Sequence, residues 1–260
     1  MIKTQLFGEQ LFTIGNLLSF HECQEIINRA NQKGWNKSSP SGGGHGRIGN
    51  EDPRTNKFSI FHDELLSEKI WNNIELYIPK NIDFLGENVY FNTHTKGREW
   101  KPKFIYNKMR IYKYDIGDVF PEHIDYKVKR HIIKDEKEYI QQSFLTLLIY
   151  LNDNIEGGKT GYWPNHCGIH CRFLRNVEKQ QSKKEHQVII TPKTGLGVIQ
   201  DQNILHEALP PTKGIKYILR TDIICEREVI RDKRVQIDLS KNKINEWERL
   251  FESSCKNYAD

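Results

Sequence analysis

The sequence predicts an α+β protein with a mainly β core, and three observations support this fold class. Two segments in the first third have the apolar spacing of amphipathic helices. From about residue 104 the spacing changes to that of strands, with turn residues between apolar runs. The tail, from about Ser240 to Tyr258, returns to helical spacing at Ile244, Trp247 and Leu250. We therefore expect a β core with helices before and after it.

The first predicted helix covers residues 18–34. Ser19 is its candidate N-cap and Gly34 its stop signal, and the face expected to be buried consists of Cys23, Ile26, Ile27 and Ala30. Residues 38–54 are rich in glycine, serine and proline. They predict a flexible loop, because no GK[ST] motif ends the segment as a phosphate-binding loop would require.

A second helix is predicted from about His62 to Tyr77, with Pro79 just beyond its end. Its expected apolar face consists of Leu65, Leu66, Ile70, Trp71 and Ile74. The strand-like runs then follow at residues 104–117, 143–153, 187–201 and 215–227. No repeat or linker divides the chain. We expect one domain over residues 1–260, with N-terminal helical and loop support (1–103), a β core (104–228) and a C-terminal helical tail (229–260).

Composition excludes several classes of protein. Hydrophobic residues make up 37% and charged residues 28% of the chain, which is typical of a globular protein and not of a disordered one. The net charge of +5 is dispersed, so it does not by itself predict nucleic-acid binding. Five irregularly spaced cysteines do not suggest a disulfide framework. With no signal peptide and no long apolar run, we expect a cytoplasmic protein that does not span a membrane.

Three residues form a candidate metal site. His123 and Asp125 are two residues apart, so both side chains point to the same side of an extended segment. His206 follows another predicted strand, where a curled sheet could bring it beside the first pair. Two histidines and one carboxylate on one face of a metal leave its other positions open. This arrangement is typical of non-haem Fe(II) oxygenases.

Charged and polar residues near the candidate ligands predict an anion in the same place. Arg110, Tyr112 and Tyr114 share one face of their strand, a set too polar for an ordinary core. Lys216 and Arg220 share one face of a later strand, where two cations are costly unless an anion meets them. A dicarboxylate cosubstrate would be such an anion.

The sequence resembles the prolyl 4-hydroxylase-like branch of the 2-oxoglutarate- and Fe(II)-dependent dioxygenases. The resemblance covers about residues 104–228 and depends on a motif of spaced residues, on the LLIYLND run, on a glycine pair and on a lysine ten residues after His206. The motif residues are Tyr114, Gly117, Phe120, His123 and Asp125, followed by Tyr150, Gly157, Gly158 and Lys216.

This resemblance implies a double-stranded β-helix, or jelly roll, as the catalytic core. It implies that His123, Asp125 and His206 bind Fe(II) and that Lys216 pairs with the distal carboxylate of 2-oxoglutarate, helped by Tyr150 and Tyr114. Arg220 is not fixed by the resemblance: it either shares that carboxylate or pairs with Asp222. The implied reaction couples the oxidation of 2-oxoglutarate by dioxygen to hydroxylation of a substrate C–H bond, with ascorbate as a candidate additional reductant.

The resemblance further implies a protein or peptide substrate, hydroxylated on proline or another side chain. Two alternatives stay open. The first is oxidative demethylation of nucleic acid, which needs an aromatic slot for a flipped base, with Tyr162 or Trp163 as candidates. The second is a non-catalytic or zinc-bound jelly-roll module that only binds a partner; the intact ligand set together with Lys216 argues against it.

Other segments have weaker interpretations. His166, Cys167, His170 and Cys171 offer zinc-type donors, although adjacent His-Cys pairs are poorly spaced for one ion. We expect the insertion at residues 161–186 to form a long loop that could act as a lid. The basic segment at residues 127–137 is expected to be a solvated loop, and Glu207 either orients His206 or is an exposed acid.

Overall fold

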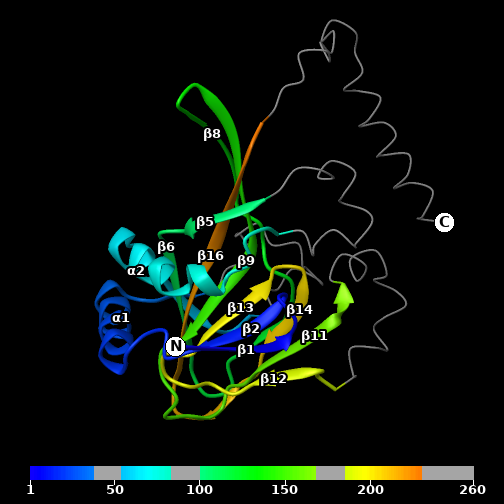
Figure 1. Cartoon of the computed structure of the whole chain (residues 1–260). Helices are drawn as coiled ribbons and strands as arrows, with labels where there is room; N and C mark the ends of the chain where they lie inside the picture. The colour runs from blue at the N-terminus through cyan, green and yellow to red at the C-terminus, as the bar shows by residue number, and fades with distance from the viewer. Residues whose placement is uncertain (38–53, 83–99, 168–184, 230–260) are drawn as a thin grey trace, which may run out of the picture. The chain divides into compact units, whose positions relative to one another are not determined.

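The computed structural model describes residues 1–37, 54–82, 100–167 and 185–229, with the backbone alone for residues 165–167. The elements from Met1 to Glu228 form one compact unit. Most of them are strands, and the pairings between named strands are antiparallel (Figure 1). The predicted mainly β architecture is therefore confirmed for this part of the chain.

The larger sheet has ten strands. Its main path is β1 (Ile2–Phe7), β2 (Leu11–Gly15), β13 (Gly197–Asp201), β9 (Lys137–Tyr150), β16 (Lys216–Glu228), β6 (Lys108–Tyr114), β4 (Lys57–His62) and β3 (Asn36–Lys37). Two more strands join it from the side: β5 (Lys101–Ile105) pairs with β16 and β8 (Lys129–Lys134) pairs with β9.

A smaller sheet has the order β12 (Val188–Ile190), β11 (Thr160–Cys167), β14 (Ile204–Ala208) and β7 (Phe120–His123). A separate pair joins β10 (Glu156–Gly157) to β15 (Pro211–Lys213). Strand β7 contains one of the candidate metal ligands and its neighbour β14 contains another. The smaller sheet is thus the one that positions the candidate site.

The two predicted helices are present. Helix α1 (Phe20–Lys33) begins at Ser19, whose side chain forms a capping box with Glu22, and ends at Gly34. Its buried residues are the four predicted ones, Cys23, Ile26, Ile27 and Ala30. Helix α2 (Glu64–Ile74), capped by Asp63, continues into a 3₁₀ turn, η1 (Glu75–Tyr77). The predicted apolar face of α2 is partly wrong, because Leu65 is 80% exposed.

Two hydrophobic clusters show how these layers pack. One joins α1 and α2 to one face of the larger sheet, and the other contains residues from both sheets. Side chains of strand β6 point alternately to its two faces and so enter both clusters. Met109 and Ile111 belong to the first cluster, and Tyr112 and Tyr114 belong to the second. The molecule is therefore a two-layer β sandwich with helices on the outer face of one sheet. The winding of a double-stranded β-helix stays a prediction.

Several predictions about segments need correction. The N-terminal segment 1–103 is not only helices and loops, because β1, β2 and β4 extend the larger sheet. The basic segment at residues 127–137 contains strand β8, which forms a hairpin with β9. Residues 161–167 are not part of a long loop but belong to β11 in the smaller sheet. Polar residues at exposed positions obscured β1 and β8 in the sequence, whereas the first residues of β11 are buried. The predicted loop at 38–53 and the predicted helix in the tail lie outside the described residues.

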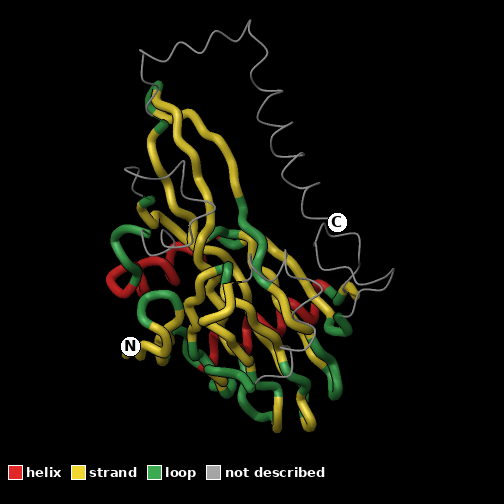
Figure 2. The backbone as a smooth tube through the Cα atoms, turned by 90° about the vertical axis from the view of Figure 1, so that its right-hand side faces the viewer, coloured by secondary structure: helices red, strands yellow, loops and turns green. Residues whose placement is uncertain are grey.

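Strand β8 and the parts of β9 and β16 beside it project beyond the sandwich (Figure 2). The cysteines that can be assigned, Cys23 and Cys225, are buried and unpaired. Among the helices of the described segments, none has the length and apolar character needed to cross a membrane.

The exposure of α2 leads to a prediction about stability. Ile70 is fully buried and Leu65 is 80% exposed, although the sequence placed both on one apolar face. We expect Ile70→Ala to lower the free energy of unfolding by about 2–5 kcal/mol, because it leaves a cavity. The matched change Leu65→Ala should alter it by less than about 0.5 kcal/mol. Urea unfolding monitored by circular dichroism measures both free energies. Equal losses in the two variants would contradict the burial of Ile70 and the exposure of Leu65.

Candidate metal centre

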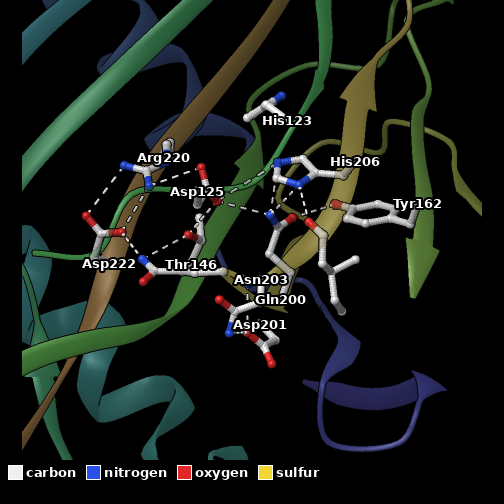
Figure 3. A network of polar contacts seen from close by, with 12 residues as sticks. His123, Asp125, Thr146, Tyr162, Gln200, Asp201, Asn203, His206, Arg220 and Asp222 are labelled. Atoms are coloured by element: carbon white, nitrogen blue, oxygen red, sulfur yellow. Dashed lines mark hydrogen bonds and ion pairs between the residues drawn. The ribbon is translucent and has the colours of Figure 1, made fainter. Parts of the chain in front are cut away.

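The pairing of two strands brings the predicted histidines together. His123 at the end of β7 lies directly opposite His206 in β14, and their ring centroids are 4.2 Å apart. The backbone N–H of Asp125 donates to the carbonyl of Gln202, 2.9 Å away, which turns the chain after β7 back toward the site. Ligand atoms of His123, Asp125 and His206 all lie within 4.8 Å of one another. The three residues that the sequence predicted to meet do so, as Figure 3 shows.

Both imidazoles are oriented by the backbone. Nδ1 of His123 lies 2.8 Å from the carbonyl oxygen of Pro121, and Nδ1 of His206 lies 2.9 Å from that of Ile204. A carbonyl can only accept, so Nδ1 of each ring donates and Nε2 keeps its lone pair. Burial lowers the pKa of His123 to about 3 and also lowers the pKa of His206. Both rings are therefore neutral donors of the kind that metals bind.

Aromatic rings fix these imidazoles from the outside. The ring of Phe120 stacks on His123 at a centroid distance of 3.7 Å, and the ring of Tyr162 stacks on His206 at 5.6 Å. The Tyr162 hydroxyl donates to Oε1 of Gln200, which leaves the amide nitrogen of Gln200 facing the site. That nitrogen lies 3.1 Å from Nε2 of His206 and 3.1 Å from Oδ2 of Asp125. Gln200 therefore links two candidate ligands.

Asp125 is held by three polar neighbours. Its Oδ2 accepts hydrogen bonds from Thr146 at 2.6 Å and from Gln200, while its Oδ1 lies 3.2 Å from Arg220. Burial alone would raise the pKa of Asp125. The positive charge of Arg220, together with the two histidines, outweighs burial and holds this pKa below its ordinary value. Asp125 is thus an ionised carboxylate with a fixed orientation.

Arg220 lies between two carboxylates. Its Nη2 is 3.2 Å from Asp125 and 3.1 Å from Asp222, and its side chain is almost buried (Figure 3). Asp222 also accepts a hydrogen bond from Gln202 at 2.8 Å. The sequence left open whether Arg220 shares the 2-oxoglutarate carboxylate or pairs with Asp222. Arg220 pairs with Asp222, which is itself buried, and it also lines the cavity; its sharing of the carboxylate stays a prediction.

Lys216 lies at the other end of the same strand face. It is fully buried, pairs in register with Tyr114, and its Nζ lies 5.0 Å from the Tyr114 ring centroid and 5.8 Å from that of Tyr150. Nζ has no hydrogen-bond partner among the residues that the structure describes. A Cβ on Gly158 would lie 3.1 Å from Cδ of this lysine, which explains why a glycine suits that position. A buried donor without a partner is costly and points to an anionic ligand.

A small cavity lies between the candidate ligands and Tyr114, which separates it from Lys216. Its volume is about 30 Å³, and it is lined by residues from both sheets, among them Tyr114, His123, Asp125, Thr160, His206 and Arg220. Tyr150 lies behind this lining, and its hydroxyl pairs with Thr160 at 2.6 Å. The cavity is smaller than a diacid, so binding of such a molecule requires lining side chains to move.

Sequence reasoning missed the polar residues that surround the ligands. Thr146 and Gln200 are fully buried in strands β9 and β13, and Gln202 is fully buried in the turn that follows β13. A polar residue in a run of buried strand positions was the available signal. Glu207 does not contact His206. Its carboxylate lies 2.7 Å from Nε2 of His186, the last residue of the segment expected to form a long loop.

Two rival interpretations can be compared with the structure. The side chains of the proposed zinc set, His166, Cys167, His170 and Cys171, lie outside the described residues. The aromatic residues suggested as a base slot are both buried: Tyr162 is fully buried against His206, and Trp163 is 4% exposed and packs on His186. Neither of them is available to stack on a flipped base.

No family model and no curated protein sequence matches the chain. Solved structures that are similar to it include the 2OG complex of a viral collagen prolyl hydroxylase from Paramecium bursaria Chlorella virus-1, with 19% identity, a TM-score of 0.46, and coverage of 85% of this chain and 98% of that one. A Pseudomonas putida prolyl-4-hydroxylase has 12% identity, a TM-score of 0.45, and coverage of 82% and 92%.

A third similar structure is a Trichoplax adhaerens prolyl hydroxylase in complex with a peptide fragment of the hypoxia inducible factor oxygen degradation domain. It has 15% identity, a TM-score of 0.48, and coverage of 83% of this chain and 84% of that one. Superpositions as loose as these three do not transfer an activity to the chain.

The contacts of Asp125 predict how strongly its neighbours affect metal binding. We expect Thr146→Val to weaken the binding of Mn(II) or Fe(II) by about 10- to 100-fold, because the carboxylate loses the hydrogen bond that orients it. Thr146→Ser keeps the hydroxyl and should restore most of the affinity. Anaerobic titration calorimetry measures the three constants. Unchanged affinity in the valine variant would show that Thr146 does not position Asp125.

Lys216 predicts a rise in stability with pH. Burial lowers its pKa from 10.5 to about 7. Between pH 7 and pH 9 the unfolded chain binds a proton here that the folded chain releases, so the free energy of unfolding rises with pH, by up to about 1.4 kcal/mol per pH unit. Above pH 9 the raised pKa values of the buried Cys23 and Cys225 oppose this rise.

Lys216→Met should abolish the rise, whereas Lys213→Met, which changes a side chain that is 75% exposed, should retain it. Urea unfolding between pH 7 and pH 9 without added ligand provides the slopes. Equal slopes in the wild type and Lys216→Met would mean that Lys216 is not buried as an unpartnered amine.

Proposed function

We propose that the protein is an Fe(II)- and 2-oxoglutarate-dependent oxygenase. The observation on which this depends has two parts: two histidines and one carboxylate line a small cavity, and an unpartnered buried lysine lies next to Tyr114 in the wall of that cavity. Either feature alone is compatible with several classes of protein. Together they provide a metal site with open positions and a cation for a diacid that reaches that metal.

The donor atoms suit ferrous iron. His123 and His206 offer Nε2 lone pairs, and Asp125 offers an ionised carboxylate that Thr146 and Gln200 orient. Neutral imidazole with carboxylate is a set that Fe(II) binds, and the three donors come from one side. In this proposal His123, Asp125 and His206 are the metal ligands. When bound, iron and 2-oxoglutarate would supply the oxidation of a substrate C–H bond to an alcohol, with dioxygen consumed and succinate and carbon dioxide released.

The space beside Tyr114 and Lys216 suits the distal carboxylate of 2-oxoglutarate, once lining side chains move to open the cavity toward this lysine. Lys216 would pair with it, and the ring of Tyr114 and the Tyr150–Thr160 hydroxyl pair would form the wall around it. An anion at Nζ would keep the lysine charged and remove the cost of burying an unpartnered donor. In the proposal Lys216 binds the cosubstrate and excludes neutral molecules from this end.

Arg220 would have a second role near the metal. It keeps Asp125 ionised and holds it against rotation, since it is fixed from behind by Asp222. Arg220 therefore positions Asp125 in this proposal.

We further propose a protein or peptide acceptor, modified on proline or another side chain within a jelly-roll core. Support comes from the motif residues between Tyr114 and Asp125 and from the lysine ten residues after His206, which resemble the prolyl 4-hydroxylase-like branch. The burial of Tyr162 and Trp163 speaks against these residues as a base slot for nucleic-acid demethylation.

The experiment is turnover of 2-oxoglutarate under ferrous iron, followed by the succinate formed. We expect turnover by the wild type and none by His123→Ala or Asp125→Ala. Lys216→Met should raise the KM for 2-oxoglutarate about 10- to 100-fold, because a charge-assisted contact of about 1.5–3 kcal/mol is lost, while Fe(II) binding stays unchanged. Lys213→Met is the matched control.

No succinate from the wild type with any acceptor would refute the oxygenase. Succinate formation with equal KM values in the wild type and Lys216→Met would refute only the role of this lysine.

A further inference from the structure

Two arginines lie side by side near the candidate metal ligands. Arg110 in β6 pairs directly with Arg220 in β16, and residues that oppose each other in an antiparallel pair point to the same face. The same register pairs Tyr112 with Ile218, which both line the cavity. Arg110 therefore belongs to the row of residues that faces the site, at the end away from Lys216.

The two arginines differ in their partners. Arg220 is held between Asp125 and Asp222, whereas the hydrogen bond of Arg110 is to the neutral hydroxyl of Tyr112, 3.3 Å from Nη1. Within the described segments Arg110 has no carboxylate within 4.0 Å, although it is near enough to Asp222 to oppose the rise in pKa that burial causes there. Like charges placed directly opposite each other destabilise a strand pair. An external anion would relieve that repulsion.

A charge count indicates whether that anion is 2-oxoglutarate. Arg110, Arg220 and Lys216 can carry three positive charges, against the two negative charges of Asp125 and Asp222. A ferrous ion and a 2-oxoglutarate dianion cancel each other. With both bound, one positive charge among these five side chains is in surplus. Arg220 pairs with Asp125 and Asp222, and Lys216 would pair with the cosubstrate, so Arg110 is the cation of the three without a carboxylate within 4.0 Å among the described residues. The cosubstrate therefore does not account for it, and a second anion does.

We propose that Arg110 binds a carboxylate of the acceptor substrate, so that the enzyme selects peptides with an acidic side chain close to the oxidised residue. This inference rests on the proposed function and adds a specificity-determining residue to it. Guanidinium groups bind carboxylates through two parallel hydrogen bonds, and one strand spacing of about 4.8 Å separates Arg110 from Arg220 beside the ligands. The acidic residue therefore lies within one or two positions of the oxidised one.

The test uses two peptide libraries as acceptors. One is a randomised library, and the other is the same library with Gln and Asn in place of Glu and Asp. Gain of one oxygen is read by mass spectrometry, while succinate formation without acceptor is measured in parallel. The wild type should hydroxylate members of the acidic library with at least about tenfold higher kcat/KM than their amide counterparts.

Arg110→Gln should remove this preference, lowering kcat/KM for acidic acceptors about 10- to 100-fold while leaving amide acceptors and the KM for 2-oxoglutarate unchanged. Arg110→Lys keeps the positive charge but cannot form the two parallel hydrogen bonds, so its kcat/KM for acidic acceptors should lie between those of the wild type and Arg110→Gln. It tests the proposal if the glutamine variant does not fold. Lys113→Gln is the matched control, because it removes a charge from the same strand on the opposite face.

Several outcomes would overturn the inference. These are equal kcat/KM for the two libraries, oxidation of methylated oligonucleotides but of neither library, or a raised KM for 2-oxoglutarate in Arg110→Gln. Succinate formation by the wild type in these same assays shows that the oxygenase itself stands. Its absence with every acceptor would refute the proposed function instead.

Discussion

The pairing of β7 with β14 is the interaction on which the rest of the site depends. It sets His123 directly against His206, and the hydrogen bond from Asp125 to Gln202 then turns the carboxylate toward both. A shift of one residue in this register would send the His206 side chain to the opposite face of the small sheet. The stacked rings of Phe120 and Tyr162 and the neighbouring strand β11 oppose such a shift. The register that packs these strands is thus also the register that brings the candidate ligands together.

That constraint places charges where a sandwich core would normally be apolar. Arg220, Asp125 and Asp222 satisfy one another, and Thr146, Gln200 and Gln202 supply the remaining hydrogen bonds. A fully connected buried network of this kind gives a single arrangement of side chains. Lys216 is outside that network. Sites that retain a destabilising group of this sort are usually functional, because a ligand supplies what the fold does not.

Much of this could be read from the sequence, and the failures have physical causes. Alternation along β6 and β16 correctly gave the face of Tyr114, Lys216 and Arg220, because a strand of period two has only two faces. Alternation could not show that Thr146 or Gln200 contacts Asp125, because these contacts join different segments of the chain and depend on which strands pair and in what register. Strand β8 was missed because its polar residues are exposed on a projecting hairpin. The N-cap of helix α1 at Ser19 was predicted correctly, because capping depends on residues that are close together in the sequence.

The ligand set by itself does not decide between an oxygenase and a zinc hydrolase, because two histidines and a carboxylate serve both metals. The distinction comes from Lys216, which lies next to Tyr114 in the wall of the cavity. A hydrolase that activates water needs no buried cation there, and an unpartnered ammonium beside Tyr114 and Tyr150 would only destabilise the fold. A cosubstrate with one carboxylate to reach the metal and another to reach Lys216 would give both the ligand set and the buried lysine a role. The lysine, more than the histidines, therefore favours the oxygenase.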